Sequence, residues 1–372
     1  MDYLGKNIPK LGFGLMRLPK KNGVIDIAQT CDMVDRFLEA GFTYFDTAYV
    51  YEGSEAAIKK ALVDRHPREC YQLATKLTAW TAVKNADEAR QMFYTSLERT
   101  GAGYFDFYLL HNLGDDRTRL YDDYKLWDFV LELKEKGLVR HIGFSMHDTA
   151  AALDKILTAH PEAEFVQLQV NYSDWNHKEV QSRLCCEVAK KHNKPIIIME
   201  PVRGGLLASP QKAVAELFRK VNPEASPASW ALRFVGSLDY DIITILSGMS
   251  NIEQLKENIA IFKNFRPLDD KEKEAIRAAQ EIFDNAKTIP CTDCRYCMEG
   301  CPEGIAIPGI LEALNRYIVY ENLPVARGKY RRATKGGGVA SKCIECGQCE
   351  SACPQHIGII DELKRAVEVF EH

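Results

Sequence analysis

Eight of the twelve cysteines in the sequence lie between residues 291 and 353, in two copies of one pattern. The copies read Cys291-x2-Cys294-x2-Cys297-x3-Cys301-Pro302 and Cys343-x2-Cys346-x2-Cys349-x3-Cys353-Pro354. Disulfide frameworks are typical of short exported chains. This chain has 372 residues, and its first residues lack a basic segment followed by an apolar stretch. The clustered thiols therefore indicate a metal site in a reducing compartment, and we expect a cytoplasmic protein.

The repeated spacing is that of bacterial two-cluster iron–sulfur proteins, in which the fourth cysteine of each run ligates the other cluster. Three thiolates on one tight loop can reach three corners of a cubane, and the turn at the proline carries the fourth thiolate away. We therefore predict two [4Fe–4S] clusters, one held by Cys291, Cys294, Cys297 and Cys353 and the other by Cys301, Cys343, Cys346 and Cys349. Zinc is the alternative, but zinc sites take their cysteines in two pairs.

The segment between the two motifs is long and contains a predicted helix over Ile310–Tyr320, so the region resembles the α-helical ferredoxin modules of larger oxidoreductases. Residues 325–342 of this segment hold six cations and no acidic residue. Such a run is either a solvated loop or a docking site for an acidic electron carrier such as ferredoxin or flavodoxin. The cations are Arg327, Lys329, Arg331, Arg332, Lys335 and Lys342.

A second set of residues that could do chemistry lies near the ends of successive apolar runs: Asp46, Tyr51, Lys76 and His111. An ammonium favours the phenolate and lowers the pKa of a nearby tyrosine, and a carboxylate can fix that ammonium. The result is a proton donor for a carbonyl oxygen that receives hydride, and His111 could orient the same oxygen. Each residue alone also has a purely structural interpretation, as an ion pair, a loop anchor or a core histidine.

The elements that would position these residues are short buried runs alternating with amphipathic segments, which indicate βαβ units around a parallel sheet. Eight repeats match a closed (β/α)8 TIM barrel better than an open sheet. The predicted strands are Leu11–Leu18, Phe42–Ala48, Cys70–Leu77, Phe105–Leu113, Arg140–Met146, Phe165–Asn171, Pro195–Pro201 and Ile242–Met249. The predicted helices are Ile27–Ala40, Ser54–Arg65, Asp87–Arg99, Tyr124–Lys136, Thr149–Thr158, Lys178–Lys191, Ala228–Val235 and Ile252–Ile261.

We predict an α/β chain with three parts: the barrel over residues 1–265, a connector helix within 266–288, and a smaller, mainly α-helical ferredoxin-type domain over 289–372. The net charge of −4 gives no support to binding of nucleic acid or a membrane surface. No apolar run approaches the ~20 residues of a membrane helix. The phosphate-loop and G-x-G-x-x-G signatures are absent from the sequence.

The barrel region resembles the aldo-keto reductase family. The motifs that carry the resemblance are Phe45-Asp46-Thr47-Ala48-x-x-Tyr51, Thr75-Lys76, Leu110-His111, Ile142-Gly143-Phe144-Ser145, Gln169-Val170-Asn171-Tyr172 and the segment from Gly248 to Asn258. The resemblance implies a catalytic tetrad of Asp46, Tyr51, Lys76 and His111, and reduction of a small carbonyl substrate with NADPH. It also implies that Ser145 and Gln169 hold the nicotinamide carboxamide and that Asn258 contacts the adenine.

Some positions depart from the family pattern. Gly248 and Gln254 replace the basic residues that clamp the 2′-phosphate, which leaves NADP(H) and NAD(H) both open. Arg203, on the loop after the seventh strand, is either a phosphate contact or a surface residue. Met146 replaces an asparagine, and Met199 replaces the aromatic residue that stacks on the nicotinamide.

The two predicted centres differ in the number of electrons that they move. Nicotinamide transfers two electrons as hydride and an iron–sulfur cluster transfers one, so a flavin normally bridges them. Three arrangements remain: a carbonyl reductase with structural or redox-sensing clusters, a reductase in which the clusters feed a barrel-bound flavin such as FMN, and a non-catalytic regulatory module. We favour the first.

Overall fold

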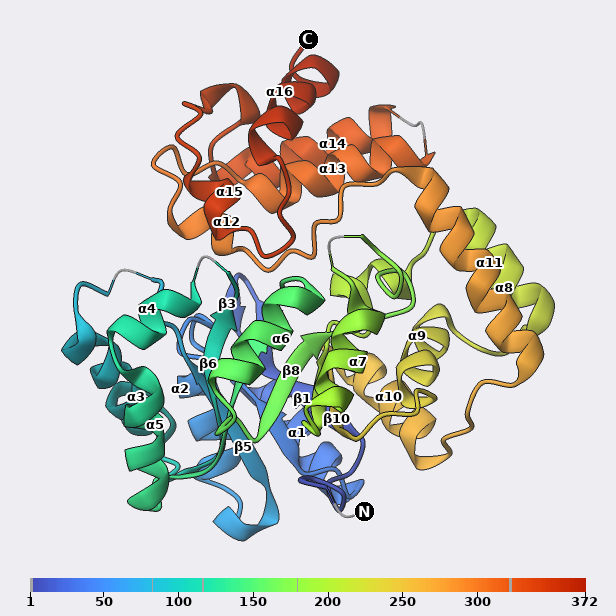
Figure 1. Ribbon diagram of the computed structural model, residues 1–372. Coiled ribbons are helices and arrows are strands. Elements are labelled where there is room, and N and C mark those ends of the chain that lie inside the picture. The colour runs from blue at the N-terminus through green and yellow to red at the C-terminus, as the bar shows by residue number, and fades with distance from the viewer. Residues whose placement is uncertain (1–2, 82, 116, 179, 321–322) are drawn as a thin grey trace. The chain divides into compact units, whose positions relative to one another are not determined.

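The computed structural model describes residues 3–81, 83–115, 117–178, 180–320 and 323–372 (Figure 1). The chain forms two compact units. Residues 3–202 and 228–268 make the first, and residues 203–227 and 269–372 make the second. The sequence-based boundaries instead placed residues 203–227 with the barrel and residues 269–288 in a separate connector.

The first unit is a closed barrel of eight parallel strands, which confirms the predicted fold class. The strands follow the order β1-β10-β9-β8-β7-β6-β5-β4 around the barrel. Each predicted run contains one strand, and β6 is buried along its whole length, as expected for a parallel sheet covered on both faces. The strands are β1 Leu11–Gly14, β4 Tyr44–Asp46, β5 Gln72–Leu77, β6 Phe105–Leu113, β7 Val139–Met146, β8 Phe165–Gln169, β9 Ile196–Met199 and β10 Ile242–Gly248.

Helices cover the outside of the barrel, and four of them begin at a side chain that caps the first turn. Asp26, Asn85, Thr149 and Asn251 each accept a hydrogen bond from the backbone N–H three residues ahead. The helices are α1 Ile27–Glu39, α2 Ser54–Ile58, α3 Ala86–Thr100, α4 Thr118–Asp123, α5 Leu126–Glu135, α6 Ala150–Ala159, α7 Ser182–Lys191, α9 Pro227–Gly236 and α10 Ile252–Lys263. The sequence did not predict α4 or the hairpin of β2 (Lys20–Lys21) and β3 (Val24–Ile25).

The barrel interior is filled by large side chains that come from different strands. The rings of Tyr44 and Phe107 lie 5.1 Å apart, and those of Phe107 and Phe165 lie 5.2 Å apart. Gly143 on β7 lies opposite Phe165 on β8. A Cβ at Gly143 would come within 2.5 Å of the Phe165 carbonyl oxygen and 2.8 Å of its ring. Only glycine therefore allows these two strands and the Phe165 ring to pack as they do.

The second unit is helical, and its first part pairs two helices that are distant in sequence. α8 (Lys212–Val221) packs against α11 (Asp270–Ala286), as Figure 1 shows. α11 begins with a capping box, in which Asp269 and Glu272 bind each other's backbone N–H groups at 2.9 and 3.0 Å. The contact between α8 and α11 explains why residues 203–227 belong to this unit.

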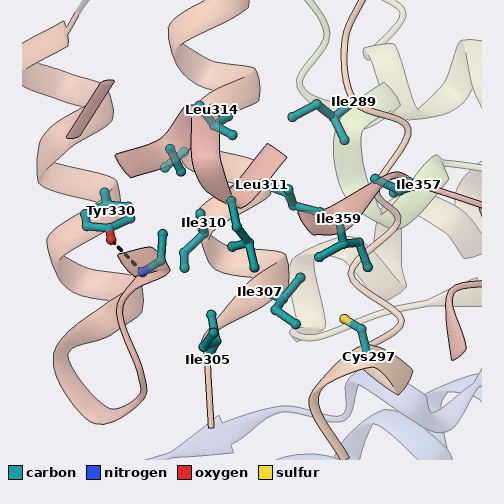
Figure 2. Close-up of a cluster of buried hydrophobic side chains, with 14 of the residues drawn as sticks. Ile289, Cys297, Ile305, Ile307, Ile310, Leu311, Leu314, Tyr330, Ile357 and Ile359 are labelled. Carbon is teal, nitrogen blue, oxygen red and sulfur yellow. Dashed lines mark hydrogen bonds between the residues drawn. The ribbon is translucent and has the colours of Figure 1, made fainter. Parts of the chain in front are cut away.

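The remaining helices enclose a separate apolar core. They are α12 Tyr296–Glu299, α13 Ile307–Tyr320, α14 Leu323–Ala333, α15 Gln348–Ala352 and α16 Ile359–Phe370. Figure 2 shows buried isoleucines and leucines of α13 gathered beside Ile289, Ile357 and Ile359. Tyr330 of α14 stacks on Phe370 of α16 at 4.9 Å and accepts a hydrogen bond from the Ala340 N–H at 3.0 Å.

The interpretation of residues 325–342 as a solvated loop is wrong for their first half, because Leu323–Ala333 forms α14. Two short 3-10 turns follow, Thr334–Gly336 and Ala340–Lys342. Between them, Gly338 bridges to Ile305. The many cations hid the helical pattern in the sequence. Few residues form the buried face of this helix, and Ala326 and Tyr330 are among them. Among the described residues, no helix is both long enough and apolar enough to cross a membrane.

Substitution of Gly143 tests the close contact between β7 and β8. Gly143→Ala should lower the free energy of unfolding of the barrel by about 1–3 kcal/mol, because the added methyl group forces apart a filled interior. Gly14→Ala is the matched control, since a Cβ there meets its nearest atom at an ordinary 3.5 Å. Thermal and urea unfolding would measure both, and equal stability of the two variants would contradict the packing argument.

Candidate functional site

Four polar side chains lie around the ends of three neighbouring strands of the barrel. Asp46 is the last residue of β4, Lys76 is near the end of β5, and His111 is near the end of β6. Tyr51 lies in the connection between β4 and α2. Because parallel strands in a barrel end at one face, and active sites of this fold lie at that face, the topology brings the four residues to the same rim.

Asp46 and Lys76 form a buried ion pair at the base of this site. Lys76 Nζ lies 2.5 Å from Asp46 Oδ1 and donates a second hydrogen bond to the Thr47 carbonyl oxygen at 2.6 Å. Lys76 is fully buried and Asp46 is 3% exposed. Burial lowers the pKa of Lys76, and the Asp46 carboxylate opposes this effect; burial also raises the pKa of Asp46 against the pull of Lys76. Each charge is therefore retained only because the other is present.

Tyr51 lies directly beside this ammonium. Lys76 Nζ is 5.1 Å from the centroid of the Tyr51 ring. The ring meets the His111 imidazole edge to face, at 6.2 Å between centroids and an interplanar angle of 86°. Tyr51 is held by a turn in which its N–H donates to Ala48 at 3.0 Å and its carbonyl accepts from Ser54 at 3.0 Å. The half-buried phenol thus lies between a buried cation and an imidazole.

His111 is fixed by groups from the connection after β5 and from α4. Its Nδ1 shares a hydrogen bond of 2.9 Å with the Thr78 hydroxyl. Its carbonyl oxygen accepts from Tyr121 Oη at 2.7 Å and from Trp80 Nε1 at 2.9 Å. Burial, with the nearby charges of Lys76, His147 and Arg117, holds the pKa of His111 well below its usual value of 6.5. The imidazole is therefore neutral at pH 7 and can act as a hydrogen-bond donor or acceptor.

The residue after His111 has an unusual backbone conformation. Asn112 has φ of +62° inside β6, where the register to β7 shifts between Leu110 and Leu113. Its N–H donates to the Ser145 hydroxyl at 2.9 Å. A β-bulge re-aims the side chains beside it, so this irregularity links the orientation of His111 to Ser145. The sequence analysis did not identify Thr78, Tyr121 or Asn112.

Ser145 and Gln169 lie at the ends of adjacent strands, β7 and β8. Gln169 Nε2 donates to Asp174 at 2.8 Å, and Gln169 Oε1 is 2.9 Å from His147 Nδ1. Asp174, which is fully buried, also accepts from Asn171 at 2.8 Å. An amide can make more than one hydrogen bond at each end, so these partners orient Gln169 and leave it capacity for a ligand.

Three other predicted nucleotide contacts lie together at the end of β10 and on α10. Gly248 ends β10, and Asn258 Nδ2 donates to the neighbouring Ser247 hydroxyl at 2.8 Å. Gln254 is exposed in the first turn of α10, where its side-chain oxygen accepts from the Ser250 N–H at 2.7 Å. Arg203 falls in the second unit, at the start of the 3-10 segment Arg203–Ala208, and is buried.

The eight clustered cysteines divide into two sets in the second unit. Each set lines its own small cavity. The first cavity is lined by Cys291, Cys294, Cys297 and Cys353, and the second by Cys301, Cys343, Cys346 and Cys349. Each set contains three cysteines of one motif and the fourth cysteine of the other, as the spacing predicts.

The two cysteine loops share one backbone form. Asp293 and Arg295 flank Cys294 with φ of +56° and +70°, and Glu345 and Gly347 flank Cys346 with φ of +57° and +77°. Among the described residues, no three His, Cys, Asp or Glu side chains converge closely enough to hold a single metal ion. The thiols of each set thus surround a space instead of meeting at a point.

Apolar side chains complete both cavities, including Leu311 and Ile359 in the first and Ile307 and Leu363 in the second. Burial raises the pKa of Cys297, and that of Cys349 to about 11. Such thiols become good ligands once a metal displaces their protons. The residues therefore fit a compact group of several metal atoms with four thiolate ligands.

Comparison with known proteins identifies both parts of the chain. Residues 10–281 match the sequence model of the aldo/keto reductase family, and residues 290–357 match that of the 4Fe-4S dicluster domain. The chain is 28% identical over 259 residues to the 9,11-endoperoxide prostaglandin H2 reductase of Trypanosoma cruzi, covering 68% of this chain and 82% of that protein. It is also 28% identical over 275 residues to the methylglyoxal reductase DkgB of Escherichia coli O157:H7, covering 73% and 92%.

Solved structures show the same barrel. The aldo-keto reductase AKR11C1 from Bacillus halodurans superimposes with a TM-score of 0.57 at 22% identity, covering 75% of this chain and 95% of that chain. An aldo-keto reductase from Klebsiella pneumoniae in complex with NADPH gives 0.58 at 18% identity, covering 73% and 92%. With a family match over most of its length, this chain belongs to the aldo/keto reductase family, and a 4Fe-4S dicluster domain follows its barrel.

Proposed function

We propose that this protein reduces the carbonyl group of a small aldehyde or ketone with hydride from NADPH or NADH, with Tyr51 as the proton donor. The observation that carries the proposal is the buried Asp46–Lys76 pair with its ammonium 5.1 Å from the Tyr51 ring. Named reductases among the relatives and the NADPH-bound barrel of similar fold support the same chemistry.

The chain's own residues have separate roles in such a reduction. When bound, a reduced nicotinamide would supply the hydride, with its two electrons, for the carbonyl carbon. Tyr51 transfers its hydroxyl proton to the carbonyl oxygen, which completes the alcohol. Lys76 favours the phenolate that remains, because an opposite charge nearby stabilises the ionised form. Neutral His111, held by Thr78, orients the carbonyl oxygen through a hydrogen bond.

Residues on three strands support nicotinamide binding at the same rim. The Ser145 hydroxyl accepts from the Asn112 N–H and retains its own proton for donation to a carboxamide oxygen. Gln169 is oriented by Asp174 and His147. We assign Gly248, Gln254 and Asn258 to the adenosine side. None of these three residues is a cation that would favour a 2′-phosphate. We would therefore test both NADPH and NADH as cosubstrates.

We further propose that the second unit holds two [4Fe–4S] clusters. Cys291, Cys294, Cys297 and Cys353 would hold one, and Cys301, Cys343, Cys346 and Cys349 the other. Four thiols around each of two cavities, and the match to a dicluster domain, support this assignment. When bound, such clusters accept and release one electron at a time.

Removal of the phenol hydroxyl tests the proposed proton donor. Tyr51→Phe should lower kcat/KM for a panel of aldehydes and ketones by about 10²–10⁴-fold, since a positioned general acid contributes about that much. The affinity for NADPH, measured by fluorescence titration, should stay unchanged. Tyr94→Phe, at an exposed tyrosine on α3, serves as the control. Undiminished turnover by Tyr51→Phe would remove Tyr51 from its assigned role.

The pH dependence of the reaction tests the charge state of His111. Because the pKa of His111 is held well below 6.5, the imidazole stays neutral as pH rises from 6 to 8. We therefore expect kcat/KM for carbonyl reduction to be flat over this range and to fall only at alkaline pH, where the phenol loses its proton. A titration near pH 6.5 that disappears in His111→Gln would show that the histidine acts in its charged form.

Removal of the fourth cysteine of one motif tests which thiols form each ligand set. Cys353→Ala should reduce the iron content of anaerobically purified protein from about eight to about four atoms per chain, because it removes one ligand from one set only. The exposed Cys70 provides a control variant, Cys70→Ala, which should keep all its iron. Iron and sulfide analysis with EPR would decide. Zinc in place of iron, or full iron in Cys353→Ala, would contradict the assignment.

A further inference from the structure

The two cysteine sets differ in how they meet the solvent. Cys346 of the second set is exposed, whereas every cysteine of the first set is buried or half-buried. The residues around Cys346 share this exposure, and Ile344 keeps 59% of its surface accessible. The loop therefore presents both a thiol ligand and an aliphatic side chain to the solvent. The second set is therefore the one that an external molecule can approach.

A group of exposed cations precedes this loop in the sequence. Of the six cations between residues 325 and 342, two serve the unit itself. Lys329 pairs with Glu312 at 2.8 Å, and Arg327 donates to the carbonyl oxygens of Val369 and His372 at the end of α16. The other four, which we call the basic surface, are exposed. They are Arg331, Arg332, Lys335 and Lys342.

Within the part of the chain that the structure describes, no carboxylate pairs with any member of the basic surface. The acidic side chains close in sequence to the second cysteine set include Glu299 and Glu303, which are exposed, and Glu345, which is paired with Lys364 at 2.9 Å. The basic surface is therefore a local concentration of positive charge in a chain whose net charge is −4.

Backbone contacts connect the basic surface to the second cysteine set. After Lys335, the Gly338 N–H donates to the Gly304 carbonyl at 2.7 Å, and the Gly338 carbonyl accepts from Ala306 at 3.2 Å. These contacts lie on the loop that begins at Cys301. Lys342 immediately precedes Cys343. Lys342 thus adjoins one thiol of the second set, and the segment that follows the other three cations is hydrogen-bonded to the loop that begins at Cys301.

We propose that the basic surface, with Ile344 and Cys346, is the docking site of a small acidic one-electron carrier protein of the ferredoxin type. The proposal rests on the iron–sulfur function proposed above. In the productive complex the reduced carrier loses one electron and the centre held by Cys301, Cys343, Cys346 and Cys349 gains it, with no proton or bond exchanged. Complementary charge steers such encounters and fixes orientation, while the exposed apolar residue provides the desolvated contact.

Charge reversal of the basic surface tests the docking site. In the full-length protein, purified without oxygen, we would combine Arg331→Glu, Arg332→Glu and Lys335→Glu. The control combines Lys220→Glu, Lys271→Glu and Arg277→Glu, which are exposed cations of α8 and α11 with the same total charge change. The association rate constant with an immobilised acidic [4Fe–4S] ferredoxin should fall about tenfold or more in the first variant and change little in the control. The difference should shrink at high salt.

Each other outcome overturns the proposal. If association slows equally in both variants, the effect comes from net charge and not from the basic surface. If an acidic protein without a redox centre binds as well as the ferredoxin, the surface is not a dedicated site for a redox partner. Absence of binding by the unmodified protein would exclude the carrier. Iron content and NADPH-linked carbonyl reduction are measured on the same preparations. Protein without iron would overturn the cluster assignment together with the docking site, whereas full iron with unaltered binding would overturn the docking site alone.

Discussion

The proposed chemistry of the barrel depends on one interaction, the ion pair between Asp46 and Lys76, both of which are buried. A buried ammonium without a counter-ion would lose its proton, and removal of one partner of such a pair costs about 3–5 kcal/mol. The pair also bridges the ends of β4 and β5, so it fixes the position of the charge that faces Tyr51. The same contact therefore stabilises the rim of the barrel and sets the environment of the phenol.

The groups around this pair form a second layer that fixes direction. Thr78 holds the His111 imidazole at Nδ1, Tyr121 holds the His111 backbone carbonyl, and Asn112 joins β6 to Ser145. Asp174 and His147 orient Gln169 in a similar way. Hydrogen bonds of this kind allow few alternative orientations, and a reaction that moves a hydride and a proton to adjacent atoms needs that restriction.

The second unit differs from the barrel in what its site residues surround. Its apolar core lies beside two cavities that are each lined by four cysteines. Its proposed centres move single electrons, whereas a nicotinamide moves two together. Direct exchange between the two kinds of centre is therefore unfavourable. An external one-electron partner gives the clusters a use that does not require such an exchange.

The sequence by itself determined the barrel, the helical iron–sulfur region and the residue types of both sites. Buried runs and amphipathic segments alternate along the chain, and the spacing of the cysteines indicates which thiols lie on the same loop. These are local patterns, and the structure confirms the eight-stranded barrel that they predict. The crossing of Cys301 and Cys353 between the two sets was also predicted, because proline after each of them turns the chain away from its own loop.

Only the tertiary structure decided which side chains hold others in place. Thr78 and His111 are 33 residues apart, as are Asn112 and Ser145, and nothing in the local sequence marks such pairs. The structure also shows that half of the predicted loop is α14. Among the described residues, Lys329 and Arg327 have partners within the unit, whereas the members of the basic surface have no carboxylate partner. Pairing depends on a partner brought close by folding, as Glu312 is brought to Lys329. Composition records the charges of a segment, but only the folded chain fixes the distances between them.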